Sequence, residues 1–225
     1  MIDFHTHLDL INDNLGSVIG RAKTAGVEGF IVPGVCGFPQ KIDILKKYKE
    51  IKVCWGIFPK YAEEEGIFET AKHELMESDT PVFAIGECGL DKRFGNLEKQ
   101  TELFRKQIDL AVELQLPLVI HLVGYYGRAY EILYGAGIKN GFILHSWTGS
   151  AQMAKEFVKI GGKISLSAGI LKNPKKIREL FEAVPEESIL YETDSPDQKP
   201  GFWQGDFNEP AVLPEIIKRI GANRK

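Results

Sequence analysis

Short runs of apolar, often β-branched residues alternate along this chain with longer amphipathic segments. The apolar runs have the length of buried strands, and we expect strands at residues 2–5, 29–32, 53–57, 82–86, 118–121, 142–145, 163–166 and 189–192. The amphipathic segments carry apolar residues at helical spacing, and we expect helices at 15–26, 39–50, 67–78, 96–115, 127–137, 150–162, 173–184 and 208–221. Several of these segments end at glycine, as helices often do.

Eight strands that alternate with eight helices are the element count of a (β/α)₈ TIM barrel. An open, doubly wound sheet is the alternative, but no glycine-rich GxGxxG loop follows the first apolar run. A chain of 225 residues has the length of one such barrel, and no linker-like or low-complexity stretch divides it. The sequence therefore predicts an α/β barrel that forms a single domain over residues 1–225.

Composition narrows the class of protein. Hydrophobic residues make up 44% and charged residues 26% of the chain, as in ordinary globular proteins. The net charge of −3 gives no sequence-wide basic field of the kind that favours nucleic acid. The three cysteines have no metal-like or disulfide-like spacing, and no apolar run approaches the roughly 18 residues of a membrane span. We expect a soluble cytoplasmic enzyme without membrane contact, and nothing in the sequence indicates an obligate protein partner.

The first strand carries two histidines in the stretch FHTH. Side chains two residues apart on a strand point to the same side, so His5 and His7 are expected to lie next to each other. Two neighbouring imidazoles repel each other when both are protonated, and they gain most by sharing a metal ion. This pair alone is as consistent with a packed polar core as with a metal site.

The other side chains that could bind a metal or transfer a proton are predicted at the ends of strands. In barrels of this kind the active site lies at the C-terminal ends of the strands. Four further strands end in a metal-ligating residue, namely Glu87, His121, His145 and Asp194. The fifth histidine, His73, falls in the middle of a charged helix and is expected on the surface.

Each of these residues has a plain structural explanation when taken alone. A strand histidine is usually a hydrogen-bonded core residue, and an acid at a strand end can cap the next helix. Six buried polar groups that face one cavity, however, are costly unless they are paired. Imidazole and carboxylate ligands in that number suit divalent cations such as zinc, manganese, iron or magnesium. We therefore predict two or three divalent ions, with nickel as a further candidate for the bound species.

The residue positions also predict a mechanism. Two metals that share a hydroxide activate water and clamp a phosphoryl or carbonyl oxygen. Glu87 is the expected bridging ligand, and Asp194 can hold a metal and accept a proton from the attacking water. No GxSxG nucleophile elbow is present. The sequence thus indicates hydrolysis without a protein nucleophile, with Glu87 and Asp194 as the catalytic groups.

The motifs around these residues resemble those of the TatD-like metal-dependent deoxyribonucleases, which belong to the amidohydrolase superfamily. The similar segments are FHTHLD, GECGLD at 86–91, LHSWTGS, ETDSP and NEP at 208–210, and they span nearly the whole chain. The resemblance implies a (β/α)₈ barrel and magnesium- or manganese-supported hydrolysis of DNA phosphodiesters. It also implies a set of metal ligands, namely His5, His7, Glu87, His121, His145 and Asp194.

The chain departs from the family pattern in loops that would face a substrate. Phe58 and Lys60 stand in GIFPK where histidines are common, and Phe207 precedes NEP where an arginine is common. Arg128 lies one turn beyond the usual arginine of the loop after His121. These changes leave the expected ligands intact and bear on the substrate instead.

Three functions remain open from the sequence. The first is a deoxyribonuclease acting on DNA as substrate, for which Arg93, Arg128 and Trp147 are candidate contacts to phosphates and bases. The second is a hydrolase of an amide, lactone or small phosphoester on the same barrel. The third is a catalytically inactive binding module, which the full set of six converging side chains disfavours.

Overall fold

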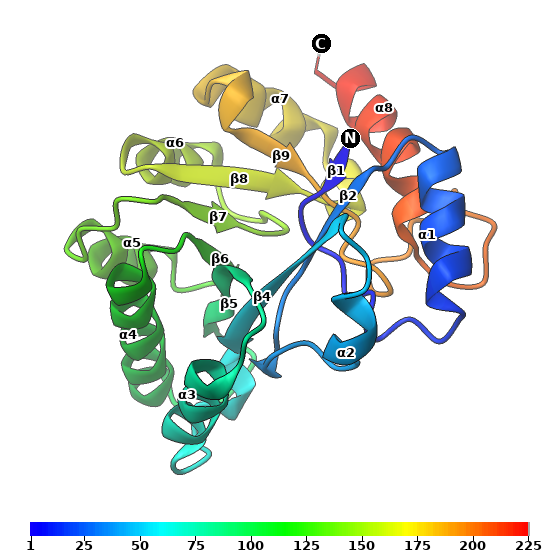
Figure 1. Ribbon diagram of the computed structural model, residues 1–225. Coiled ribbons are helices and arrows are strands. Elements are labelled where there is room, and N and C mark those ends of the chain that lie inside the picture. Colours follow the sequence, from blue (N-terminus) through cyan, green and yellow to red (C-terminus); the bar gives the residue numbers. More distant parts are fainter. Residues whose placement is uncertain (225) are drawn as a thin grey trace.

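The computed structural model describes residues 1–224, and its strands form one curved sheet (Figure 1). Neighbouring strands along the sheet run in the order β1-β2-β4-β5-β6-β7-β8-β9 and are all parallel, while the short β3 pairs antiparallel with β4. The strands are β1 (Ile2–Asp3), β2 (Gly29–Val32), β3 (Cys36–Gly37), β4 (Ile51–Ile57), β5 (Val82–Asp91), β6 (Leu118–Val123), β7 (Phe142–Leu144), β8 (Gly162–Leu166) and β9 (Ile189–Tyr191).

Helices follow the parallel strands and surround the sheet (Figure 1). They are α1 (Leu15–Thr24), α2 (Ile42–Leu45), α3 (Ile67–Glu77), α4 (Leu97–Leu114), α5 (Tyr126–Tyr134), α6 (Ala151–Lys159), α7 (Pro174–Ala183) and α8 (Leu213–Ala222). Short 3₁₀ turns stand at η1 (Pro59–Tyr61), η2 (Ala168–Lys172), η3 (Glu186–Ser188) and η4 (Pro210–Val212). This alternation confirms the predicted (β/α)₈ TIM barrel. No helix among the described residues is long and apolar enough to cross a membrane.

Backbone hydrogen bonds bring the two ends of the sheet together. The Phe4 amide donates to the Tyr191 carbonyl at 3.2 Å, and the Asp194 amide donates to the His5 carbonyl at 2.9 Å. The buried Asp3 carboxylate adds to this junction, since it accepts from the backbone amide of Thr193 at 2.9 Å and from its hydroxyl at 2.6 Å. The barrel is therefore nearly closed, and the segment after β1 lies against the segment after β9.

Side-chain caps explain why several helices begin where the sequence predicts. The Asn96 side chain accepts from the Glu98 and Lys99 amides at the start of α4. Asn14, Ser150 and Asn173 cap α1, α6 and α7 in the same way. A side-chain oxygen at this position satisfies an amide that has no partner within the helix.

The structure differs from the sequence prediction at 39–50 and at β3. The predicted helix of 12 residues is a single turn, α2, which begins after Lys41 in the left-handed conformation (φ 56°) and buries only Leu45. One buried residue gives a longer helix too little apolar contact to stabilise it. The strand β3 is only two residues long, below the length at which periodicity is informative.

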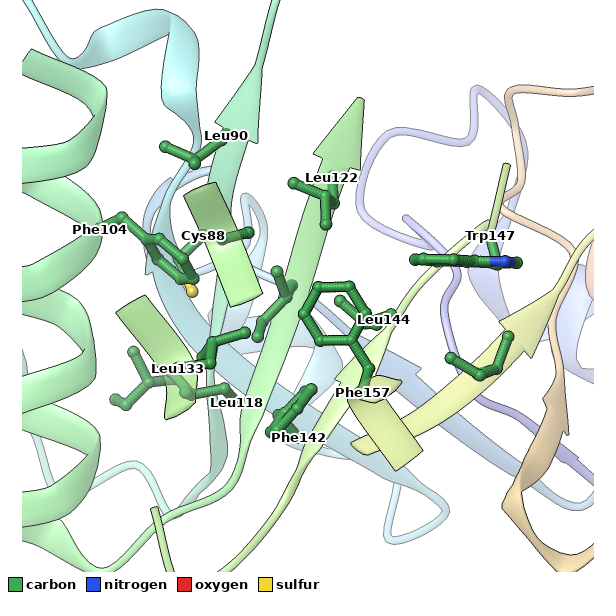
Figure 2. Packing of buried hydrophobic residues seen from close by; sticks show 14 of the residues in the cluster. Cys88, Leu90, Phe104, Leu118, Leu122, Leu133, Phe142, Leu144, Trp147 and Phe157 are labelled. Atoms are coloured by element: carbon green, nitrogen blue, oxygen red, sulfur yellow. The ribbon is translucent and has the colours of Figure 1, made fainter. Parts of the chain in front are cut away.

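The apolar core consists of a layer between sheet and helices, which is divided into a larger and a smaller cluster, and a third, small cluster inside the barrel. The layer contains Phe104, Leu118, Phe142, Leu144 and Phe157, which pack together in Figure 2. The interior cluster takes one residue from each of four neighbouring strands together with Phe4; these are Ile31, Cys54, Ala84 and Val119. Because they alternate with residues of the outer layer, these side chains fill the barrel beneath the polar groups described next.

Candidate functional site

The first group of polar side chains joins the segment after β1 to the segment after β9. His5 and His7 direct their Nε2 atoms to within 3.3 Å of each other. The Oδ1 atom of Asp194 lies 3.7 Å from the first Nε2 and 3.9 Å from the second. All three side chains are buried, so three potential ligand atoms converge on one point away from bulk water.

The second group involves β6 and the end of β7. His121 Nδ1 and His145 Nε2 are 2.9 Å apart. Both face one oxygen of Glu87, since Oε1 lies 2.8 Å from the first nitrogen and 2.9 Å from the second. The other oxygen, Oε2, lies 3.5 Å from His5 Nε2 and 3.6 Å from His7 Nε2. Glu87 therefore divides its two oxygens between the two groups.

An irregularity in β5 places Glu87 at this central position. The pairing register between β5 and β6 shifts between Ile85 and Cys88. At the shift, Cys88 packs in the outer apolar layer, and Glu87 faces the barrel interior. Gly89 follows at φ 140°, and a side chain there would stand 2.0 Å from the His121 carbonyl. Glycine thus lets β5 and β6 approach closely enough for Glu87 to reach His121.

Two further carboxylates contact the two histidines of the second group at the ring nitrogens that do not face Glu87. Asp91 Oδ2 lies 2.8 Å from His121 Nε2, and Arg93 Nε donates to the same carboxylate oxygen at 2.9 Å. Glu192 Oε1 lies 3.3 Å from His145 Nδ1 and accepts from the Ser146 amide at 2.7 Å. Each ring is thereby fixed at the nitrogen that points away from Glu87. Such outer hydrogen bonds orient a metal-binding imidazole.

The electrostatics of the cluster are those of closely coupled charges. Burial disfavours ionisation of Glu87, but the His145 charge and the hydrogen bond from His121 outweigh it and hold the Glu87 pKa well below its usual value. Burial likewise disfavours a charge on His145, yet Glu87 raises the His145 pKa well above normal. Burial lowers the pKa of His5 and His7, and it raises the pKa of Asp194 to about 6.

These groups fit divalent metal ions. Among the residues that the structure describes, the buried Nδ1 atoms of His5 and His7 have no hydrogen-bond partner, and the Nε2 atoms of the two rings face each other at 3.3 Å. Imidazole nitrogens and carboxylate oxygens at this spacing are the donor set of zinc, manganese and iron sites. The structure thus brings together all six side chains that the sequence singles out, while His73 lies exposed on α3 as expected.

A cavity of about 400 Å³ opens above these groups. Its lining includes His7, Glu87, His121, His145 and Asp194, together with Phe58, Arg93, Ser146, Thr148, Asp197 and Gln198. The Phe58 ring stands against the His121 ring with centroids 4.6 Å apart. The Gln198 amide nitrogen donates to Asp194 Oδ2 and, at 2.7 Å, to the Ser146 hydroxyl. Asp194 is therefore held at one oxygen while the other faces the histidines.

Of the three substrate contacts that the sequence suggests, the structure places one at the cavity and two away from it. Arg93 lines the cavity and keeps a largely exposed guanidinium while it binds Asp91. Arg128 lies outside the lining and pairs with Glu131 at 3.5 Å. Trp147 is 3% exposed and packs on Phe157 in the apolar core, as Figure 2 shows. Its ring offers no face to a base, because the chain turns at Ser146 (φ 44°) and directs the indole inward.

Sequence reasoning missed Asp91, Glu192 and Gln198. The first two carried a usable signal, because each lies an even number of residues from a predicted ligand on an extended segment. Asp91 is four residues beyond Glu87 on β5, and Glu192 is two residues before Asp194. Period-two alternation therefore places both on the ligand side of the sheet. Gln198 follows a turn, and its contact with Asp194 has no such pattern.

Comparison with known protein families and proteins gives consistent results. A family model described as TatD related DNase matches residues 2–225. YabD of Bacillus subtilis, described as an uncharacterized metal-dependent hydrolase, is 32% identical over 98% of this chain and 89% of its own length. A Salmonella typhimurium protein named 3'-5' ssDNA/RNA exonuclease TatD is 30% identical over 90% of this chain and 82% of its own.

Solved structures agree with the fold. The crystal structure of YjjV, a TatD homolog from Escherichia coli, superposes with a TM-score of 0.86 at 28% identity, covering 100% of this chain and 90% of that one. A TatD family hydrolase from Entamoeba histolytica has a TM-score of 0.85 at 18% identity, with 100% and 91% coverage. The second likeness concerns the fold alone.

Proposed function

We propose that this chain, which belongs to the TatD-related DNase family and is therefore a metal-dependent hydrolase, is a deoxyribonuclease. It would hydrolyse DNA phosphodiester bonds with a metal-activated water. The observation that carries the proposal is the position of Glu87 between two groups of histidines. One oxygen faces His5 and His7, and the other faces His121 and His145. A single carboxylate shared in this way suits a pair of divalent ions.

In the proposed arrangement, one ion would be held by His5, His7, Asp194 and Glu87 Oε2. The other would be held by His121, His145 and Glu87 Oε1. Magnesium or manganese is proposed as the activating metal, while the nitrogen-rich ligand set also accommodates zinc, iron or nickel. Bound divalent ions lower the pKa of a coordinated water and neutralise charge on the phosphoryl group.

The protein groups around the ions have separate roles. Asp194 keeps Oδ1 toward the histidines and Oδ2 toward the cavity and Gln198, so we assign it both a ligand role and receipt of the proton from the attacking water. Asp91 and Glu192 orient the two histidines of the second ion. Arg93 stands on the cavity wall, where its guanidinium can contact a phosphate oxygen of the substrate.

The proposed substrate is single-stranded DNA, which enters the cavity by one of its ends. The cavity of about 400 Å³ has room for a phosphodiester and an adjoining group, but not for a duplex. The Salmonella typhimurium and Klebsiella pneumoniae relatives named 3'-5' ssDNA/RNA exonuclease TatD support this choice. Because the net charge is −3, we expect the attraction for phosphate to come from the metal site and a few local cations rather than from the whole surface.

A second candidate, a hydrolase of a small non-nucleic-acid ester or amide, is favoured by one observation. Phe58 presents an aromatic ring beside His121, and Phe94 packs against it with centroids 5.7 Å apart. This aromatic wall would accept an apolar substrate group as readily as a base. The metal chemistry is the same for both candidates, so only a choice of substrates separates them.

The test is a time course on end-labelled single- and double-stranded DNA with metal-stripped, magnesium-loaded and manganese-loaded protein. Asp194→Asn should lose turnover by a factor on the order of 10²–10⁴, as expected for a lost general base. Asp109→Asn is the matched control, because Asp109 is an exposed residue of α4 far from the cavity lining. Stepwise, metal-dependent shortening that disappears only in Asp194→Asn supports a deoxyribonuclease. Intact DNA with a metal-loaded protein that hydrolyses small esters refutes it in favour of the second candidate.

A further inference from the structure

A second cavity adjoins the metal-site cavity across the side chain of Gln198. It has a volume of about 260 Å³, lies between η2 and the loop at 198–202, and has Lys172, Lys199 and Phe202 among its lining residues. We call it the Phe202 pocket. Gln198 lines both cavities. Gly169 also lines the Phe202 pocket, and a Cβ atom there would stand 2.8 Å from Gln198 Oε1. Because Gly169 has no side chain, the Gln198 side chain alone separates the two cavities at this point.

The boundary itself is held in place by hydrogen bonds. The Gln198 amide nitrogen donates to Asp194 Oδ2 and to the Ser146 hydroxyl, and its oxygen accepts from the Ser167 hydroxyl at 2.8 Å. A side chain fixed by three partners does not swing across the opening. A chain-like substrate that leaves the metal-site cavity over Gln198 therefore enters the Phe202 pocket next.

The pocket offers an aromatic face and positive charge together. The Arg219 guanidinium covers one face of the Phe202 ring, with its Cζ atom 4.1 Å from the ring centroid. Phe202 is half-buried and is one of the residues that line the pocket. Lys172 and Lys199 are exposed at the rim. The pocket is smaller than those that enclose a whole drug-sized ligand, which suits one planar ring with a charged group outside it.

We propose that the Phe202 pocket binds the nucleotide next to the scissile phosphodiester, with its base against Phe202 and its phosphate between Lys172 and Lys199. This inference rests on the proposed nuclease function and assigns the path of the strand. Stacking of a base on an aromatic ring tolerates any sequence, and lysines contact phosphate without reading a base. The pocket thus supplies affinity for a nucleic acid strand without sequence preference.

Two variants test the two parts of the pocket. Phe202→Ala removes the stacking face, and we expect roughly a 5- to 100-fold loss of affinity for single-stranded DNA. The double variant Lys172→Gln/Lys199→Gln should weaken binding and also reduce the slope of log K against log salt by about 0.7, the value for one phosphate contact on a single strand. The matched control is Lys49→Gln/Lys155→Gln, which removes the same charge from exposed lysines outside both cavities.

Affinity is measured on metal-loaded protein that keeps Asp194, with a labelled phosphorothioate oligonucleotide that resists hydrolysis, so that the strand is not degraded. Steady-state kinetics on single-stranded DNA and on bis(p-nitrophenyl) phosphate follow in the active background. We expect kcat/KM to fall on DNA and to stay close to that of the parent enzyme on the small diester, which occupies only the metal-site cavity. This contrast separates loss of the pocket from loss of folding.

The outcomes distinguish the pocket from the proposed function on which it rests. DNA that the parent protein binds and cleaves, with affinity and salt slope unchanged in both pocket variants, overturns the pocket alone. Equal losses on the oligonucleotide and the small diester also overturn it, because they indicate damage to the metal site. No binding and no cleavage of DNA by the parent protein overturns the pocket together with the nuclease function.

Discussion

The most direct test of the metal site is the substitution Asp91→Asn, which acts one layer behind the ligands. Asp91 is fully buried, and its Oδ2 atom contacts both His121 Nε2 at 2.8 Å and Arg93 Nε at 2.9 Å. Asparagine keeps the shape but loses the charge, and its amide nitrogen replaces one of the two oxygens. Either Oδ2, which His121 and Arg93 share, or Oδ1, which accepts from the Arg93 backbone amide and Nε, is lost as an acceptor, and in both cases the hydrogen bond to His121 loses its charge.

The size of the effect follows from this contact. Loss of an outer hydrogen bond to a metal-binding histidine lowers metal affinity by about 10- to 100-fold, which corresponds to about 1.4–2.8 kcal/mol. The loss of a hydrogen bond to a charged group gives a similar figure, about 1.5–3 kcal/mol. Two independent estimates therefore agree, and the loss should fall on the ion that His121 helps to bind.

The assay is a calorimetric titration of manganese into metal-stripped protein, with the fold checked by circular dichroism. Asp109→Asn is again the control, because it makes the same chemical change on the exposed face of α4. The expected result is one weakened binding step in Asp91→Asn and unchanged steps in the control. A folded Asp91→Asn protein with parental affinity at every step would refute the assignment of His121 as an oriented ligand.

Two further outcomes concern stability. Phe104→Ala removes a fully buried ring of α4 and should lower the free energy of unfolding, measured in urea titrations, by about 3–5 kcal/mol. The control is Tyr134→Ala, at a ring that is 70% exposed, which should change this free energy by far less. Equal effects of the two substitutions would contradict the packing. Removal of metal with a chelator should lower the melting temperature by about 5–10 °C, because an ion present at 100 times its Kd adds about 2.7 kcal/mol to the free energy of unfolding. An unchanged melting temperature in protein verified to be free of metal would contradict metal binding to the folded state.

Much of this structure was accessible from the pattern of the sequence because the relevant elements are long and regular. The strand that carries His121 and the helix that begins after Asn96 lie within a few residues of their predicted ranges, since a continuous apolar run and a side-chain cap are local properties. The convergence of His5, His121 and Asp194 followed from a general rule that strand ends meet at one rim. Their role as metal ligands stays a prediction.

Other features depend on contacts that no local pattern encodes. The helix predicted around Leu45 shortens to one turn because too little of it is buried. Trp147 follows a strand end, as the ligands do, but the left-handed turn at Ser146 sends its ring into the core. Gln198 reaches Asp194 across a turn of the loop. Each of these depends on which side chains lie next to one another in space rather than in sequence.

The junction between the two ends of the sheet also bears on how the protein reaches its folded state. The Thr193 hydroxyl and the Asp3 carboxylate are 190 residues apart in sequence, so their contact closes one of the longest loops in the chain. Such contacts carry the entropy cost of loop closure before they contribute stability, and they slow folding. His5 and Asp194 meet at this same junction. Intermediates that contain the central strands but lack this closure would therefore hold His121 and His145 near Glu87 while the remaining half of the ligand set is still dispersed.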